Sequence, residues 1–407
     1  MISVNDAKSI IQKRVFELKS EIVDLSDSSG KILANNIKAK FSSPSFDNSA
    51  MDGFAVRSSD TFGATRTNIL SLKNIDVSSA GSPSDLILKK GECIQCMTGA
   101  KIPKGADAII MVEDTSGFSN DKTVRIMIEA KLGQHIRKIG EEVNQGDILI
   151  KKGTILTTSE IGVCASFGYG ELSVSKKPKV AIFATGNELV EPGKNLIEGE
   201  IYNSNLFLFA DLVKKSGSKV IMRNVIKDDK SSLKSFLFEA LETCDIIISS
   251  GGVSMGRYDY VREVFIDLGV KEHFWKVAQK PGKPFFFGTK NKSLIFGLPG
   301  NPVSSYIGFM IWVWPVLKQL MGSLKDKSTK GLLSEPFPLE KLKQRYLFGQ
   351  AWIENGKLRC KASTKTGSHM LSSALEANCI LSADRGEGFL KAGDFIDVIM
   401  LPWKIIK

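Results

Sequence analysis

The sequence predicts an α/β plus β protein: a central α/β domain with a mostly parallel sheet, a β-rich module before it, and a small β-barrel or sandwich after it. Three observations support this fold class. Between about 179 and 322, short apolar runs alternate with helix-length segments, as in a parallel sheet that helices cover on both faces. From about 44 to 150, and again from 330 to 407, short strand-like runs alternate with turn residues instead. The 407 residues suffice for two to four domains.

Composition narrows the possible partners. Lys and Arg number 55 against 44 Asp and Glu, a net charge of +11, which favours acidic ligands. The lysines are spread along the chain with no basic tract interleaved with aromatic residues, so we expect no nucleic-acid partner. No window approaches the roughly 18 apolar residues of a membrane-spanning helix. Six cysteines without a secretory signal indicate reduced thiols in a cytoplasmic protein.

Two helices are expected outside the α/β pattern. Residues 5–19 carry apolar side chains at near-helical spacing, with Asn5 or Asp6 as the N-cap. A second helix is expected over 159–167, and it ends at Gly168.

The remaining elements follow from local patterns. The β-rich module contains strand candidates at 91–97, 108–112 and 123–128. In the α/β domain the strands are expected at 180–184, 220–226, 245–249 and 293–296, and the helices near 203–216, 231–242, 259–268 and 302–320. An Asn-Gly pair within 352–358 predicts a hairpin, and 394–400 is a closing strand.

Three unusual loops follow strands of the expected parallel sheet: TGNE at 185–188, SSGGVSMGRYD at 249–259 and GLPGNP at 297–302. Ligands of such sheets bind beyond the carboxyl ends of the strands. Small residues and exposed backbone N–H groups at a helix N-terminus suit a phosphate. One glycine-rich corner can be purely steric, but three converging loops favour an anion site.

The second loop matches neither of the common phosphate motifs. It is not G-x-x-x-x-G-K-[ST], and it is not G-x-G-x-x-G. Asp259 at its end can cap the following helix, or it can hold a Mg²⁺ ion beside a phosphate. The local sequence leaves both interpretations open.

Between the second and third loops, the stretch WKVAQKPGKP carries Lys276, Lys280 and Lys283. Lysine runs usually form a solvated face. Here Pro281 and Pro284 fix the backbone, and a preorganised set of cations suits an oxyanion or a polyphosphate.

The β-rich module contains SFDNSAMDGFAV at 45–56, which by itself predicts only an Asx-rich turn entering a strand. Residues 137–142 form a second turn with basic and acidic side chains. Cys93 and Cys96 have the spacing of a zinc or redox motif. We reject that interpretation, because residues three apart in a strand point to opposite faces and the three histidines have no ligand spacing.

Taken together, these stretches resemble one family. SFDNSAMDGFAV, MTGA at 97–100, IRKIGEE at 136–142, TGNE, SSGGVSMGRYD, FWKVAQKPGKP at 274–284 and GLPGNPVS occur in order over nearly the whole chain. They resemble the molybdopterin molybdenumtransferases, the MoeA family, which is related to the C-terminal domain of gephyrin.

The resemblance implies a homodimer of elongated four-domain subunits. The expected domains are a discontinuous one formed by 1–43 and 146–177, an inserted β-rich domain at 44–145, a molybdopterin-binding α/β domain at 178–326 and a C-terminal β-barrel-like domain at 330–407. The resemblance also implies the final step of molybdenum cofactor synthesis. Molybdate reacts with adenylylated molybdopterin in the presence of Mg²⁺, and AMP is released. Molybdopterin adenylyltransferase and molybdoenzymes or cofactor carriers would be transient partners.

The resemblance also assigns roles to individual residues. Catalytic roles are implied for Asp52, Glu188, Asp259, Lys276 and Lys280, and the first three would hold Mg²⁺. Substrate-binding roles are implied for Thr98, Glu142, Thr185, Asp228, Ser249, Gly251, Gly252, Ser254, Lys283, Pro299, Asn301, Pro302 and Ser304. Lys280, Lys283 and Ser304 are the candidates for molybdate. Asp52 and Asp259 would come from different subunits.

This chain departs from the family pattern at two positions. Members commonly have Asp where this chain has Glu142 and Asn187, so Glu188 is the expected working carboxylate of its loop. Two other functions share part of the pattern. A molybdopterin adenylyltransferase is essentially the α/β domain alone, and a gephyrin-like scaffold would carry further linkers or fused domains.

Overall fold

The computed structural model describes the chain except for residues 120, 228, 253–259, 324–328 and 405–407. The chain forms two compact units. The first contains Met1–Asn35, Lys152–Thr158 and Glu171–Lys407, and the second contains Asn36–Lys151 and Ser159–Gly170. The second unit therefore consists of two segments inserted in the sequence of the first. The finer four-domain boundaries given above stay a prediction.

The first unit contains the predicted α/β domain, built on a six-stranded sheet of order β15-β12-β16-β20-β19-β17. The first four strands pair in parallel, as predicted, whereas β19 and β17 add an antiparallel edge that the sequence analysis missed. The strands are β12 Lys179–Thr185, β15 Lys219–Ile226, β16 Ile246–Ser250, β17 Lys271–Trp275, β19 Phe286–Lys290 and β20 Ser293–Leu298.

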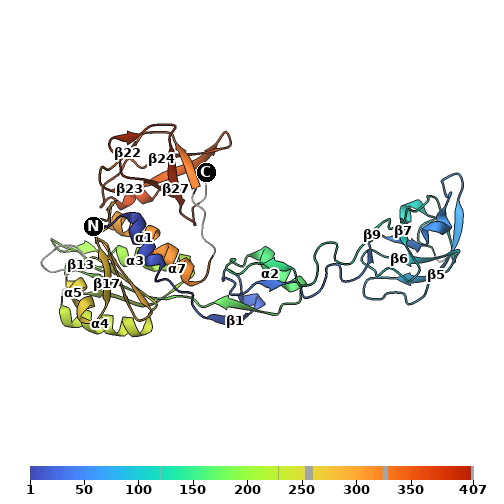
Figure 1. Ribbon diagram of the computed structural model, residues 1–407, viewed down its shortest axis with the longest axis horizontal. Helices are drawn as coiled ribbons and strands as arrows, with labels where there is room; N and C mark the ends of the chain where they lie inside the picture. Colours follow the sequence, from blue (N-terminus) through green and yellow to red (C-terminus); the bar gives the residue numbers. More distant parts are fainter. Residues whose placement is uncertain (120, 228, 253–259, 324–328, 405–407) are drawn as a thin grey trace. The chain divides into compact units, whose positions relative to one another are not determined.

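Helices cover both faces of this sheet (Figure 1). Strand β12 shows why: Val180 and Ile182 pack with one group of helices, while Ala181 and Phe183 pack with the other. The first group is α1 Val4–Gln12, α3 Asn205–Ser216, α6 Pro302–Gly308 and α7 Trp314–Leu320, and the second is α4 Lys230–Thr243 and α5 Tyr260–Asp267.

The first helix is shorter than predicted. Helix α1 ends at Gln12, and its N-cap is Ser3, whose hydroxyl accepts the N–H of Asp6. The expectation of a helix over 5–19 with a cap at Asn5 or Asp6 was wrong. The chain beyond it bonds elsewhere, with Leu18 N–H donating to Leu320 O at 2.8 Å, so tertiary contacts override the apolar spacing there.

Three further short elements within the predicted discontinuous domain agree with the sequence analysis only in part. Helix α2 spans Thr158–Ser166, close to the predicted 159–167. Strands β1 Ser20–Asp24 and β11 Glu171–Ser175 pair antiparallel and were not predicted.

The C-terminal region is a closed barrel, which decides between the two predicted alternatives. Its sheet has the order β18-β23-β24-β21-β27-β25, and an additional β23–β25 pairing closes it. The strands are β18 Gln279–Lys280, β21 Thr329–Leu333, β23 Gln344–Glu354, β24 Lys357–Ala362, β25 Cys379–Ala383 and β27 Phe395–Met400. The predicted hairpin joins β23 to β24 through Asn355 and Gly356, whose φ angles are 50° and 72°.

The second unit is built on a five-stranded sheet of order β7-β4-β6-β5-β8. Its strands are β4 Gly53–Val56, β5 Leu70–Ser78, β6 Glu92–Cys96, β7 Ala108–Met111 and β8 Thr123–Ile126, beside the short pairs β3 Asn48–Ser49 with β9 Ile136–Arg137 and β2 Ile37–Lys38 with β10 Ile148–Ile150.

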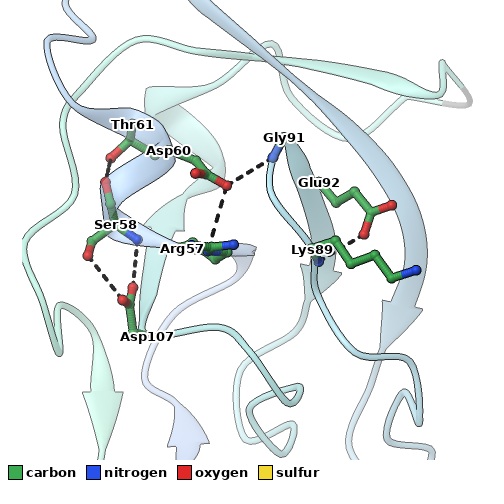
Figure 2. Close-up of polar contacts among 8 residues, drawn as sticks. All are labelled: Arg57, Ser58, Asp60, Thr61, Lys89, Gly91, Glu92 and Asp107. Carbon is green, nitrogen blue, oxygen red and sulfur yellow. Dashed lines mark hydrogen bonds and ion pairs between the residues drawn. The ribbon is translucent and has the colours of Figure 1, made fainter.

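Hydrogen bonds connect the turn after β4 to this sheet (Figure 2). The Ser58 N–H donates to Asp107 Oδ1 at 2.6 Å, and the Gly91 N–H donates to Asp60 Oδ2 at 2.9 Å. Cys93 and Cys96 of β6 belong to different apolar clusters. Burial raises the pKa of the Cys93 thiol to about 12 and that of the Cys96 thiol to about 11.

Among the residues that the structure describes, no helix is both long and apolar enough to cross a bilayer.

Candidate anion-binding site

The three loops that follow β12, β16 and β20 meet, as the sequence analysis expected. The Gly251 N–H donates to Leu298 O at 3.0 Å. A Cβ atom placed on Gly300 would lie 3.9 Å from Gly251 Cα, and one on Gly251 would lie 3.5 Å from Thr185 O. The carboxyl ends of adjacent parallel strands bring these loops together.

The glycine pair of the second loop has a steric cause. Gly251 and Gly252 adopt φ angles of 84° and 70°, a region that side chains disfavour. A Cβ on Gly252 would also lie 2.2 Å from Val261 Cγ2 and 2.8 Å from Thr185 Oγ1. Only glycine therefore lets this loop approach its neighbours so closely.

Asn205, the first residue of α3, holds two of the loops. Its Nδ2 donates to Ser250 Oγ and to Gly300 O, both at 2.7 Å. The sequence analysis missed this residue because it lies in a helix, away from any glycine-rich pattern.

The second and third loops line a cavity of about 460 Å³. Seven predicted site residues line it: Gly251, Gly252, Lys280, Lys283, Pro299, Asn301 and Ser304. Four of the described lining residues are cationic, and none is acidic. Such a cavity suits a small anion that backbone N–H groups, hydroxyls and cations can bind together.

The lysine-rich stretch is held by a buried glutamine. Gln279 is 2% exposed; its Nε2 donates to Gly282 O, and its Oε1 accepts the indole N–H of Trp312, both at 2.9 Å. These bonds fix the backbone that carries Lys280 and Lys283 into the cavity wall. The predicted preorganisation thus comes from Gln279 as well as from the prolines.

The C-terminal barrel region supplies the rest of the wall, which the sequence analysis missed. Ser368 O accepts the Val303 N–H at 3.1 Å, and Ser368 Oγ accepts from Asn301 Nδ2 at 3.3 Å. The residues of this region that line the cavity are Lys343, Arg345, Thr366, Gly367 and Ser368. The triplet Thr366, Gly367 and Ser368 has the small polar residues of an anion-binding loop. The sequence analysis missed it because it follows no strand of the parallel sheet.

Five predicted residues of the first unit do not line the cavity: Thr185, Glu188, Ser249, Lys276 and Pro302. Lys276 has a φ of 81°, and its Nζ lies 3.9 Å from the ring centroid of Trp275. Glu188 is exposed, and its carboxylate lies against Gly186, where a Cβ would meet Oε2 at 2.5 Å. Ser249 is fully buried, and its hydroxyl has no partner among the described residues.

In the second unit, Asp52 and Thr98 lie together. Asp52 Oδ1 accepts both the Thr98 N–H, at 2.7 Å, and the Thr98 hydroxyl, at 2.8 Å. The backbone bond, and after it the hydroxyl bond, lower the pKa of this exposed carboxyl. Asp52 is therefore an ionised, solvent-facing carboxylate.

The two predicted turns of this unit are joined. Asp47 accepts from Lys138 Nζ at 2.8 Å and from the Ile139 N–H at 2.9 Å. Glu142 accepts the Ser43 hydroxyl at 2.7 Å, so this longer carboxylate is bonded to the segment that precedes the Asx-rich turn.

Asp228, Ser254 and Asp259 lie outside the described residues. Within the described parts of the chain, no three His, Cys, Asp or Glu side chains are close enough to hold a metal ion. The proposed Mg²⁺ set of Asp52, Glu188 and Asp259 is divided between the two units and the undescribed segment.

A parallel sheet whose second and third loops line a cavity with four cations among its described lining residues defines an α/β protein with a candidate anion site. Three family models match this chain: "MoeA N-terminal region (domain I and II)" at residues 2–168, "Probable molybdopterin binding domain" at 181–319 and "MoeA C-terminal region (domain IV)" at 330–401. The chain belongs to the MoeA family of molybdopterin molybdenumtransferases, which are transferases of molybdenum cofactor biosynthesis.

Individual relatives agree with this assignment. The chain is 34% identical to a molybdopterin molybdenumtransferase of Haemophilus influenzae, with 98% of each chain covered. It is 35% identical to one of Staphylococcus epidermidis, covering 98% of this chain and 95% of the relative. A crystal structure of a MoeA protein from Pyrococcus horikosii superposes with a TM-score of 0.84 at 28% identity, over 98% of this chain and 99% of the other.

Proposed function

We propose that this protein inserts molybdenum from molybdate into adenylylated molybdopterin, with Mg²⁺-dependent release of AMP. One observation carries the proposal: the cavity at the second and third loops is lined by cations and small polar groups, with no carboxylate among its described lining residues. Molybdate is a tetrahedral dianion, and positioned N–H and O–H donors bind such oxyanions well in a partly enclosed site.

Some of the described residues can bind the anion directly, and others hold the loops in place. Lys280, Lys283 and Arg345 bring positive charge to the cavity, and the hydroxyls of Ser304 and Ser368 can donate hydrogen bonds there. Because Gln279 and Asn205 fix the loops before any ligand arrives, little reorganisation is needed on binding.

The residues fit a magnesium ion by the chemistry of their donors. Mg²⁺ prefers carboxylate oxygens and retains water molecules, and Asp52 is an exposed carboxylate whose pKa lies below its usual range because of Thr98. We propose that Asp52, Glu188 and Asp259 hold the ion, with Asp52 contributed by the second copy of a homodimer. When bound, Mg²⁺ neutralises charge on the phosphoanhydride.

The direct test supplies purified protein with adenylylated molybdopterin, molybdate and Mg²⁺ and follows AMP by chromatography. We expect AMP release that depends on molybdate and stops when Mg²⁺ is chelated. A parallel reaction without molybdate is the control. AMP release of equal rate in that control, or none in the complete reaction with intact substrate, would contradict the proposal.

A further inference from the structure

Two cations of the cavity wall are neighbours across the junction of the α/β sheet and the barrel. Strand β18 pairs in parallel with β23, and Lys280 is the register partner of Arg345. Both residues line the cavity. Two like charges side by side repel each other unless a counter-ion lies between them.

Glu340 supplies that counter-ion. One oxygen, Oε1, accepts from Lys280 Nζ and lies 3.4 Å from Arg345 Nη1. The backbone of Glu340 is held in turn, because its carbonyl accepts the Gly386 N–H at 3.0 Å. Glu340 is not among the described residues that line the cavity, so it contacts the two cations from outside it.

The contact with Glu340 is important because Arg345 is a buried cation. Its side chain is only 8% exposed, and its Nε has no hydrogen-bond partner among the described residues. A buried guanidinium without a counter-ion is strongly destabilising. Glu340 is the carboxylate that the described structure places against this guanidinium.

We propose that Glu340 is the internal counter-ion of Lys280 and Arg345 and competes with the incoming oxyanion for Lys280, and so sets the affinity of the cavity for molybdate. The inference rests on the proposed function of the cavity. Glu340 is a positioning residue, since it acts through the two cations. Lys280 is 47% exposed, and Glu340 is 27% exposed, so an anion in the cavity engages Lys280 while Glu340 remains with Arg345.

The test is Glu340→Gln, with molybdate binding measured by calorimetry at low ionic strength. Removing the carboxylate charge removes repulsion of a dianion, and we expect the Kd for molybdate to fall about tenfold. In the AMP assay, KM for molybdate should fall while kcat does not rise. A merely structural role would not move these quantities in this direction.

Glu335→Gln is the matched control, because it makes the same charge change in a partly exposed ion pair with Lys361; it should bind molybdate like wild type. Glu340→Asp, whose shorter arm loosens the contact with Lys280, keeps the charge should the first variant fail to fold. For it we expect a smaller fall in Kd, about threefold.

The outcomes separate the two proposals. Molybdate binding that is lost in Lys283→Gln but unchanged or weakened in both Glu340 variants overturns the role of Glu340 and leaves the cavity assignment standing. A wild-type protein that binds no molybdate overturns both.

Discussion

The loop cluster of the α/β domain and the Asp52 turn of the β-rich unit both present polar groups, but different forces hold them. Buried contacts fix the loop cluster: Asn205 bonds two loops, and Gly252 lies against Val261 and Thr185. The Asp52 carboxylate is exposed and is held only by Thr98 among the hydrogen bonds described. A change in the first region should therefore alter stability as well as activity, whereas a change in the second should alter activity alone.

The largest expected effect is at Asp52, the exposed carboxylate of the β-rich unit. Asp52→Asn keeps the shape of the side chain but removes its charge, so we expect the rate of AMP release to fall by about a hundredfold or more. Because Asp52 is exposed, the midpoint of thermal unfolding should stay within about 2 °C of wild type. A large loss of stability would contradict the contrast between the two regions.

Mixing variants extends this test to the proposed dimer. Asp52→Asn and Asp259→Asn subunits, each inactive alone, should regain part of the activity as heterodimers, because one of the two sites then has both carboxylates. Size-exclusion chromatography with tagged subunits verifies exchange. Well-exchanged heterodimers without activity would mean that the two residues do not come from different copies.

The second-largest effect is expected at Gly252, in the buried loop cluster of the α/β domain. Gly252→Ala places a Cβ 2.2 Å from Val261 Cγ2 at a φ of 70°, so we expect the free energy of unfolding to fall by about 3 kcal/mol. Gly30→Ala is the control, because Gly30 has a φ of 73° but no atom within 4 Å of the added Cβ. It should lose about 1 kcal/mol. Urea unfolding measures both, and equal losses would show that packing at Gly252 contributes nothing.

The smallest effect concerns the hydroxyl of Thr98. Thr98→Val removes one of the two bonds that lower the pKa of Asp52, so this pKa rises toward its usual value. Because the working form is the ionised carboxylate, activity should then be lost at a higher pH on the acid side of the profile, with no change near neutrality, where the carboxyl is ionised in both proteins. Thr98→Ser keeps the hydroxyl and should retain the wild-type profile; an unshifted profile in the valine variant would contradict the role of this bond.

Patterns of local sequence predicted much of the fold. The four parallel strands were found because each is a short apolar run followed by a helix, and the Asn-Gly pair specified the β23–β24 hairpin. The antiparallel strands β17 and β19 were missed because neither is followed by a helix: β17 leads into the lysine-rich stretch, and β19 leads directly into β20. The prediction that the first helix continues to residue 19 was wrong, because Leu18 bonds to the end of α7 instead.

The site was predicted unevenly for a similar reason. Gly251, Gly252 and Lys280 carry local signals, namely glycines after a strand and lysines between prolines. Arg345 and Ser368 carry none, because they reach the cavity only through the β18–β23 pairing and the docking of the Ser368 loop on α6.

The sequence alone determined the fold class, the three polar loops, the lysine-rich stretch and the family, since each depends on residues close together in the chain. Only the tertiary structure decided what lies opposite those loops. It closed the barrel, joined Lys280 to Arg345 and placed Glu340 between them. The contacts of Lys280 with Arg345 and Glu340 link residues 60 or more positions apart, and pairing at that distance depends on the packing of whole elements, which no local pattern encodes.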